Sequence, residues 1–172
     1  MIAYAGIGSR ETPFIICAQM IVAARILASN GGYKLRSGNA LGADQAFHEG
    51  CKQGRGRSEI FKPWARYNDD VVFNREDRVF NNSTPEASAI AAAHHPCWHN
   101  LNKAAQFLHA RNSHIMLGRD LDDPVSAVLC WTKGGRMEGG TGQALRIALH
   151  YDIPVYNFAV YNLETLLRKM RA

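Results

Sequence analysis

The chain has 172 residues, 47% of them apolar and 20% charged, which excludes a disordered or fibrous protein and predicts a single domain over 1–172. Its net charge of +5 favours an anionic partner without choosing among a nucleic acid, a nucleotide and simple solubility. The longest apolar stretch, 14–27, is interrupted by Gln19 and Arg25, so it predicts a buried helix and no membrane partner. Because a strand pattern begins at Ile2, we expect no signal peptide and a cytoplasmic location.

Apolar and helical patterns alternate along the chain, which predicts an α/β sheet with crossover helices. We expect strands near 2–5, 33–36, 59–61, 126–131 and 154–158, and helices over 13–29, 43–53, 140–151 and 162–170. An insertion over 63–124 breaks the alternation, with a polar start followed by helical patterns at 85–93 and 102–114. We expect this insertion to lie beside the functional site as a lid or wall, or to form a subunit contact.

Three glycine-bearing turns each follow an apolar run and open a helix-like segment. They are Gly6–Arg10, Ser37–Asp44 and Gly139–Gln143. A strand that passes straight into a helix at glycine points backbone N–H groups and the positive end of the helix dipole above the sheet, where a phosphate binds well. On neighbouring parallel strands, the three turns are expected to share one crevice for a phosphorylated nucleotide.

Two common nucleotide motifs are missing from the chain. The fingerprint G-x-G-x-x-G requires a glycine where Glu11 stands, and an acidic residue after the second strand, where the chain has Arg36 and Ser37. The pattern G-x-x-x-x-G-K-[ST] of P-loop ATPases does not occur. These differences argue against NAD as a redox cofactor, and we expect no cofactor.

Four segments together resemble the Smf/DprA and LOG superfamily (SLOG) of Rossmann-like nucleotide-binding domains, in particular its small stand-alone phage and bacterial members. Ala5–Arg10 is similar to the GSR turn of that superfamily, Arg36–Asp44 to its SGGARGAD turn, Ala110–Leu117 to its RN…ML helix, and Gly139–Gln143 to its GGTG turn. The resemblance implies a doubly wound, mostly parallel, five-stranded sheet with a helical insertion between strands three and four. It also implies a homodimer or homotetramer.

The candidate ligand-binding residues fall in or beside these segments. They are Gly8, Ser9, Arg10, Ser37, Gly38, Asn39, Asp44, Arg111, Asn112, Trp131, Lys133, Gly139, Gly140, Thr141, Gly142 and Gln143. Ser9 offers a hydroxyl and Arg10 a guanidinium fork to a phosphate or ribose, although Arg10 equally suits an ion pair with Glu11 or Asp44. Asp44 is placed either to cap its helix or to hold ribose hydroxyls.

Other candidates carry weaker signals. Only the resemblance directs Arg111 and Asn112 toward the ligand. Trp131, Lys133 and Arg136 offer an aromatic plane and two cations to a base and a phosphate, although Trp131 equally suits the core. A cluster of metal-capable residues matches no standard zinc spacing, so we expect no metal there: His94, His95, Cys97 and His99.

The glycine turns and nearby guanidinium groups favour binding of a phosphorylated nucleotide or a nucleotide-derived ligand, such as an ADP-ribose-like or cyclic nucleotide molecule. Such a protein would sense or sequester a signalling molecule. One alternative is a LOG-type nucleoside monophosphate N-glycosidase, or phosphoribohydrolase. Arg146 stands where that branch has its catalytic glutamate, so Asp44, Glu49 or Glu138 would have to supply the carboxylate.

A second alternative is single-stranded DNA binding of the DprA type. The positive net charge of the chain suits this function. Single-strand binders use a basic groove with interleaved aromatic side chains, whereas the basic clusters here are short and lie near the ends of elements. The sequence leaves these three functions open.

Overall fold

The computed structural model describes residues 1–30 and 32–171, and a parallel sheet lies at its centre. The strands of this described part are β1 (Ile2–Gly8), β2 (Tyr33–Ser37), β3 (Arg57–Lys62), β4 (Asp77–Asn81), β5 (Val128–Trp131) and β6 (Val155–Asn157). They are ordered β4-β3-β2-β1-β5-β6, and all neighbours are parallel. The chain therefore builds outward from β1 to β4 and then returns to the other side of β1, which is a doubly wound arrangement.

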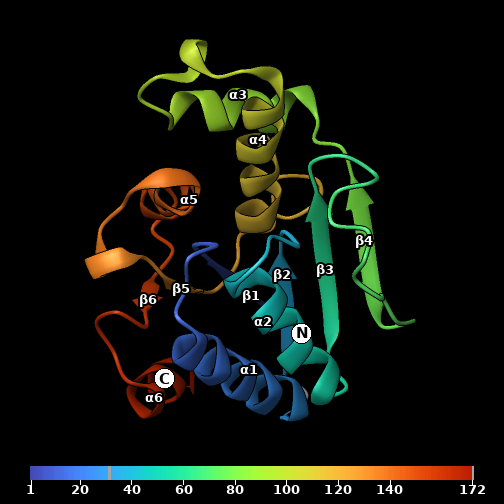
Figure 1. Cartoon of the computed structure of the whole chain (residues 1–172), viewed down its shortest axis with the longest axis vertical. Helices are drawn as coiled ribbons and strands as arrows, with labels where there is room; N and C mark the ends of the chain where they lie inside the picture. Colours follow the sequence, from blue (N-terminus) through green and yellow to red (C-terminus); the bar gives the residue numbers. More distant parts are fainter. Residues whose placement is uncertain (31, 172) are drawn as a thin grey trace.

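Helices cover both faces of the sheet (Figure 1). They are α1 (Phe14–Ser29), α2 (Ala43–Gln53), α3 (Pro85–Ala93), α4 (Lys103–Leu117), α5 (Gly139–His150) and α6 (Leu163–Arg171), with 3₁₀ turns η1 (Trp98–Asn100) and η2 (Lys133–Gly135). Tyr4 of β1 packs with Phe47 in the core under α1, α2 and α6. Ile7 of the same strand packs with Ile115 in the core under α4 and α5. This alternation follows the two-residue period of a strand buried on both faces.

The sequence correctly predicted an α/β fold, but the expected count of five strands is wrong, because the described sheet has six. The additional strand, β4, lies inside the segment expected to be a helical insertion, and it pairs with β3 from Ser58–Asp77 to Lys62–Asn81. It is an edge strand whose residues are exposed or only partly buried, so no continuous apolar run marks it in the sequence.

After β4, the insertion rises above the carboxyl edge of the sheet as α3 and α4 (Figure 1). The last turns of α4 are buried against the sheet, whereas its first turns extend past the strand ends, and α3 lies across its far end (Figure 1). Within the described residues, no helix has both the length and the apolar character needed to cross a membrane. The insertion thus supplies one wall above the strand ends.

Candidate functional site

A cavity of about 500 Å³ opens at the carboxyl edge of the sheet, where β1 and β5 lie side by side. The strand order reverses direction at this point, and open α/β sheets bind ligands at such points. We call this cavity the crevice. Its lining residues come from the ends of β1 and β5, the starts of α2 and α5, and one face of α4: Ile7, Gly8, Ser9, Arg10, Glu11, Ala40, Asp44, Ala105, Leu108, His109, Arg111, Asn112, Thr132, Lys133, Arg136, Glu138, Gly139, Gly140, Thr141 and Ala144.

The N-terminus of α5 forms one side of the crevice. Gly139, Gly140 and Thr141 line it, and the Glu138 side chain does not cap their backbone N–H groups. The first backbone N–H that makes a helical hydrogen bond is that of Gly142, which donates to the Glu138 carbonyl at 2.9 Å. A Cβ added at Gly140 would meet nothing within 4 Å, so open space lies in front of this turn. Uncapped amides and the positive end of the helix dipole make this side a cradle for an anion.

The turn after β1 forms the opposite side. The backbone N–H of Ser9 donates to the Trp131 carbonyl at 3.2 Å, and the Ser9 hydroxyl accepts from the backbone N–H of Glu11 at 3.0 Å. Arg10 is exposed and makes no ion pair with any described residue, including Glu11 and Asp44. Its guanidinium is therefore available to an anionic ligand.

The turn after β2 is closed by the chain itself. Asp44 Oδ2 accepts hydrogen bonds from the backbone N–H groups of Gly38 and Ala40, both at 3.2 Å. Arg111 donates from Nη1 to the Gly38 carbonyl, and a Cβ added at Gly38 would lie 2.6 Å from Arg111 Cζ. Gly38 accordingly does not line the crevice. The other two predicted glycine turns face the crevice with their glycines, whereas this turn contributes Ala40 and Asp44 to the lining and binds the Asp44 carboxylate with its amides.

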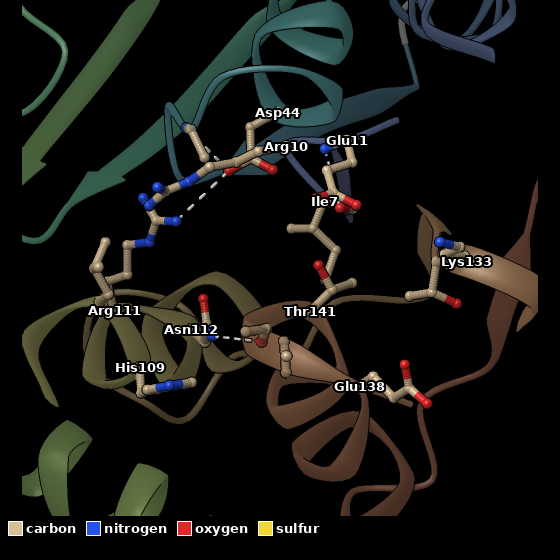
Figure 2. A pocket seen from close by; sticks show the side chains of 18 of the residues that line it. Ile7, Arg10, Glu11, Asp44, His109, Arg111, Asn112, Lys133, Glu138 and Thr141 are labelled. Atoms are coloured by element: carbon tan, nitrogen blue, oxygen red, sulfur yellow. Dashed lines mark hydrogen bonds and ion pairs between the residues drawn. The ribbon is translucent and has the colours of Figure 1, made fainter. Parts of the chain in front are cut away.

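Asp44 and Arg111 lie together at the base of the crevice, and both are buried (Figure 2). Burial raises the pKa of Asp44, while the Arg111 guanidinium and the amides of Ala40, Gly38 and Gly8 act in the opposite direction. The Arg111 guanidinium also lies 5.2 Å from the centre of the Tyr67 ring. These contacts fix both side chains before any ligand enters.

Asn112 of α4 connects the two walls made by α4 and α5. Its Nδ2 donates to the Gly140 carbonyl at 3.2 Å and to Gln143 Oε1 at 2.9 Å. Gln143 is fully buried and donates in turn to a carbonyl of α3 at 3.3 Å. Gly142 is also buried, and a Cβ there would lie 2.4 Å from the Met137 backbone. Gln143 and Gly142 therefore hold α5 in place and do not reach the crevice.

Three more predicted residues have structural positions outside the crevice. The buried Ser37 hydroxyl donates to the Gly6 carbonyl at 2.6 Å. Asn39 and Asn68 each donate from Nδ2 to the other residue's carbonyl, at 3.1 and 2.7 Å, which ties the turn after β2 to the insertion. Trp131 packs against the core under α1, α2 and α6.

Sequence reasoning missed the part of the α4 wall that precedes Arg111. Ala105, Leu108 and His109 line the crevice there. They lie seven, four and three positions before Asn112, so helical spacing places them along the same face, and this spacing was the available signal. Arg136, which the sequence offered as a cation beside Lys133, also lines the crevice, and its Nε lies 3.2 Å from Glu138 Oε1 in an exposed pair.

The charges of the lining leave two unpaired cations. Four lining residues are cationic and three are anionic: Arg10, Arg111, Lys133 and Arg136 against Glu11, Asp44 and Glu138. Arg111 and Arg136 pair with Asp44 and Glu138, whereas the cations Arg10 and Lys133 and the anion Glu11 make no ion pair among the described residues. Within residues 1–30 and 32–171, no group of three His, Cys, Asp or Glu side chains is arranged to hold a metal ion.

Comparison with known proteins bears on the fold. No protein-family model and no curated protein matches the chain. Among solved structures, the chain is similar to DNA processing protein A (DprA) from Helicobacter pylori, with a TM-score of 0.62 and 15% identity, over 98% of this chain and 80% of that chain. That structure was determined to explain the unique single-stranded DNA binding mode of the Helicobacter protein. At this identity the likeness establishes a DprA-like fold, in agreement with the motif resemblance.

Proposed function

We propose that the crevice binds single-stranded DNA, with one phosphate of the strand held against the start of α5 and between Arg10 and Lys133. One observation carries the proposal: the uncapped amides of Gly139–Thr141 and two cations without ion pairs line the same cavity. Amides at a helix N-terminus and guanidinium groups are the donors that phosphates prefer. The Helicobacter protein of similar fold, whose structure was analysed for its single-stranded DNA binding, supports the choice of partner.

The crevice is better suited to contact with the sugar-phosphate backbone of DNA than to recognition of its bases. Among the described lining residues there is no Phe, Tyr or Trp on which a base could stack, and the only ring is that of His109. Phosphate contacts carry no sequence information directly. We therefore expect binding with little sequence preference and with strong salt dependence.

A second candidate is a free phosphorylated nucleotide, including an ADP-ribose-like ligand. The size of the cavity favours it, because about 500 Å³ lies within the usual range for small-molecule sites. The amides of α5 would then hold the phosphate of a single molecule that fills the crevice. Sensing or sequestration of a signal would follow from tight binding of such a molecule.

Hydrolysis of a nucleotide would need a carboxylate beside the ribose. Asp44 lines the crevice, but its Oδ2 already accepts two backbone hydrogen bonds. Glu138 is exposed and pairs with Arg136. Arg146 donates to the Met137 carbonyl at 3.2 Å and so supports the turn before α5. These contacts favour binding over bond cleavage as the function of the crevice.

The proposal is tested by fluorescence anisotropy of a labelled oligothymidine that lacks a terminal phosphate, measured over a series of salt concentrations. We expect the logarithm of the association constant to fall linearly with the logarithm of salt, by about 0.7 for each phosphate contacted. AMP and ADP-ribose serve as competitors. Binding of these molecules without binding of the oligonucleotide would select the second candidate, and release of free base from AMP would select the hydrolase.

A further inference from the structure

His109 lines the crevice beside the N-terminus of α5, and neither DNA binding nor the fold accounts for its position. It lies one turn before Asn112, whose side chain donates to the Gly140 carbonyl, and it extends from α4 toward the start of α5 (Figure 2). Its Nδ1 is buried and has no hydrogen-bond partner among the described residues. A buried polar nitrogen without a partner is costly and calls for a function or a ligand.

Three basic side chains act on this imidazole: His95, Arg111 and Arg146. His95, which follows α3, lies edge-on with its ring centre 4.6 Å away. Burial lowers the pKa of His109, and the nearby His95, Arg111 and Arg146 lower it further, while the Gln143 amide acts in the opposite direction. The ring is therefore held neutral at neutral pH in the absence of a ligand. A bound anion would offset the charges of Arg111 and Arg146 and favour the protonated form of His109.

We propose that His109 contacts the phosphate held in the crevice and takes up a proton from solvent when that anion binds. This inference rests on the proposed function, since the anion is a phosphodiester of the bound strand. The neutral ring becomes an imidazolium whose charge is balanced by the phosphate, and no covalent bond of the ligand changes. Because protons and the anion then bind together, affinity must rise as pH falls through the titration of the bound form.

The test measures oligonucleotide affinity at constant ionic strength between about pH 5.5 and about pH 8, the range in which a histidine titrates. Internal phosphodiesters keep the same charge across this range, so any change comes from the protein. We expect affinity to be about three- to tenfold higher at the acidic end, since one unit of pKa shift corresponds to a tenfold change. The His109→Gln variant should bind with a flat profile, so its affinity relative to wild type should be lowest at the acidic end.

Two further measurements separate a ligand contact from a structural contribution of His109. NMR titration of the wild-type His109 ring should give a higher pKa in the presence of oligothymidine than in its absence, and this needs no variant. His95 lowers the pKa of His109, so His95→Gln should raise that pKa, and the pH dependence should persist and move to higher pH.

The outcomes distinguish this inference from the proposed function. If wild type binds the oligonucleotide and His109→Gln shows the same pH profile, or if the His109 pKa does not rise on binding, proton uptake by His109 is wrong while DNA binding stands. If His109→Gln weakens binding equally at every pH, the ring contacts the ligand without taking up a proton, and the proposal is again wrong. Absence of oligonucleotide binding at every pH contradicts both.

Discussion

Asp44 and Arg111 form a buried pair at the base of the crevice, with 3.8 Å between Asp44 Oδ2 and Arg111 Nη2. Asp44 accepts hydrogen bonds from backbone amides of the turn after β2, and Arg111 donates a hydrogen bond to the Gly38 carbonyl of that same turn. The protein thus occupies one potential anion site with its own carboxylate. The amides at the start of α5 therefore remain available to a ligand phosphate.

Arg111→Ala should destabilise the protein by about 2–4 kcal/mol, because it removes a charged hydrogen bond to Gly38 and leaves Asp44 buried without its cation. Arg111→Lys should recover only part of the stability that Arg111→Ala loses, since an ammonium cannot reproduce the planar contact with both the Gly38 carbonyl and the Tyr67 ring. Urea denaturation measures both effects. A loss below about 0.5 kcal/mol, typical of a surface residue, would contradict the structural assignment of Arg111.

Two glycines of the same helix should respond in opposite ways to alanine. Gly142→Ala should destabilise by about 1–3 kcal/mol, because its Cβ would lie 2.4 Å from the Met137 backbone. Gly140→Ala should leave stability unchanged or raise it by up to about 1 kcal/mol, since its Cβ would enter open space and alanine favours helix. Thermal unfolding of the matched pair measures the difference. Equal destabilisation would mean that the space in front of Gly140 is occupied.

Arg10→Ala should weaken oligothymidine binding and reduce the salt slope by about 1, since Arg10 is an exposed cation that lines the crevice. Stability should change by less than about 0.5 kcal/mol, because no described residue pairs with it. Arg25→Ala is the matched control, an exposed arginine of α1 outside the crevice. Equal losses of affinity in the two variants would indicate a diffuse charge effect and not a site.

Acid should destabilise the fold through Glu59. Burial alone would raise the pKa of Glu59, but hydrogen bonds from Lys34 at 2.8 Å and Arg36 at 2.7 Å outweigh it, and the net pKa is lowered. A carboxyl with a lowered folded pKa stabilises the protein above its unfolded pKa, about 4.3, and loses this contribution as pH falls through the folded value.

The Glu59→Gln variant tests this pH dependence. It should be less stable near neutral pH by about 1–3 kcal/mol, because the buried Arg36 loses one of its two carboxylate partners and keeps the other, Asp123. It should also lose less stability than wild type when pH is lowered from about 5 to about 3. Urea denaturation of both proteins over that range measures the two slopes. Parallel slopes would assign the acid sensitivity to other carboxylates, such as Asp77, whose pKa is also lowered.

The sequence was sufficient for the fold class because strand and helix periodicities are local. It missed β4 because an edge strand carries polar residues at both ends and is only partly buried. Gly139, Gly140 and Thr141 could be placed at the crevice because a glycine turn between a strand end and a helix start has one orientation in a parallel sheet.

Closure of the turn after β2 could not be predicted. It depends on Arg111, which lies 73 positions away from Gly38 along the chain and approaches it only through packing of α4 on the sheet. His109 could be inferred only by helical spacing from Asn112, because the rotation of α4 about its axis decides which of its residues face the crevice. Contacts between distant elements, and not local patterns, determine these details of the site.

The most direct test of the account is an amide NMR titration with oligothymidine at low salt. If a phosphate binds at the start of α5, the largest shifts should occur at Gly139, Gly140 and Thr141 and at Arg10, with small changes at Gly38 because its amide is bonded to Asp44. Shifts confined to residues outside the crevice, or equal shifts at Gly38 and Gly140, would contradict it.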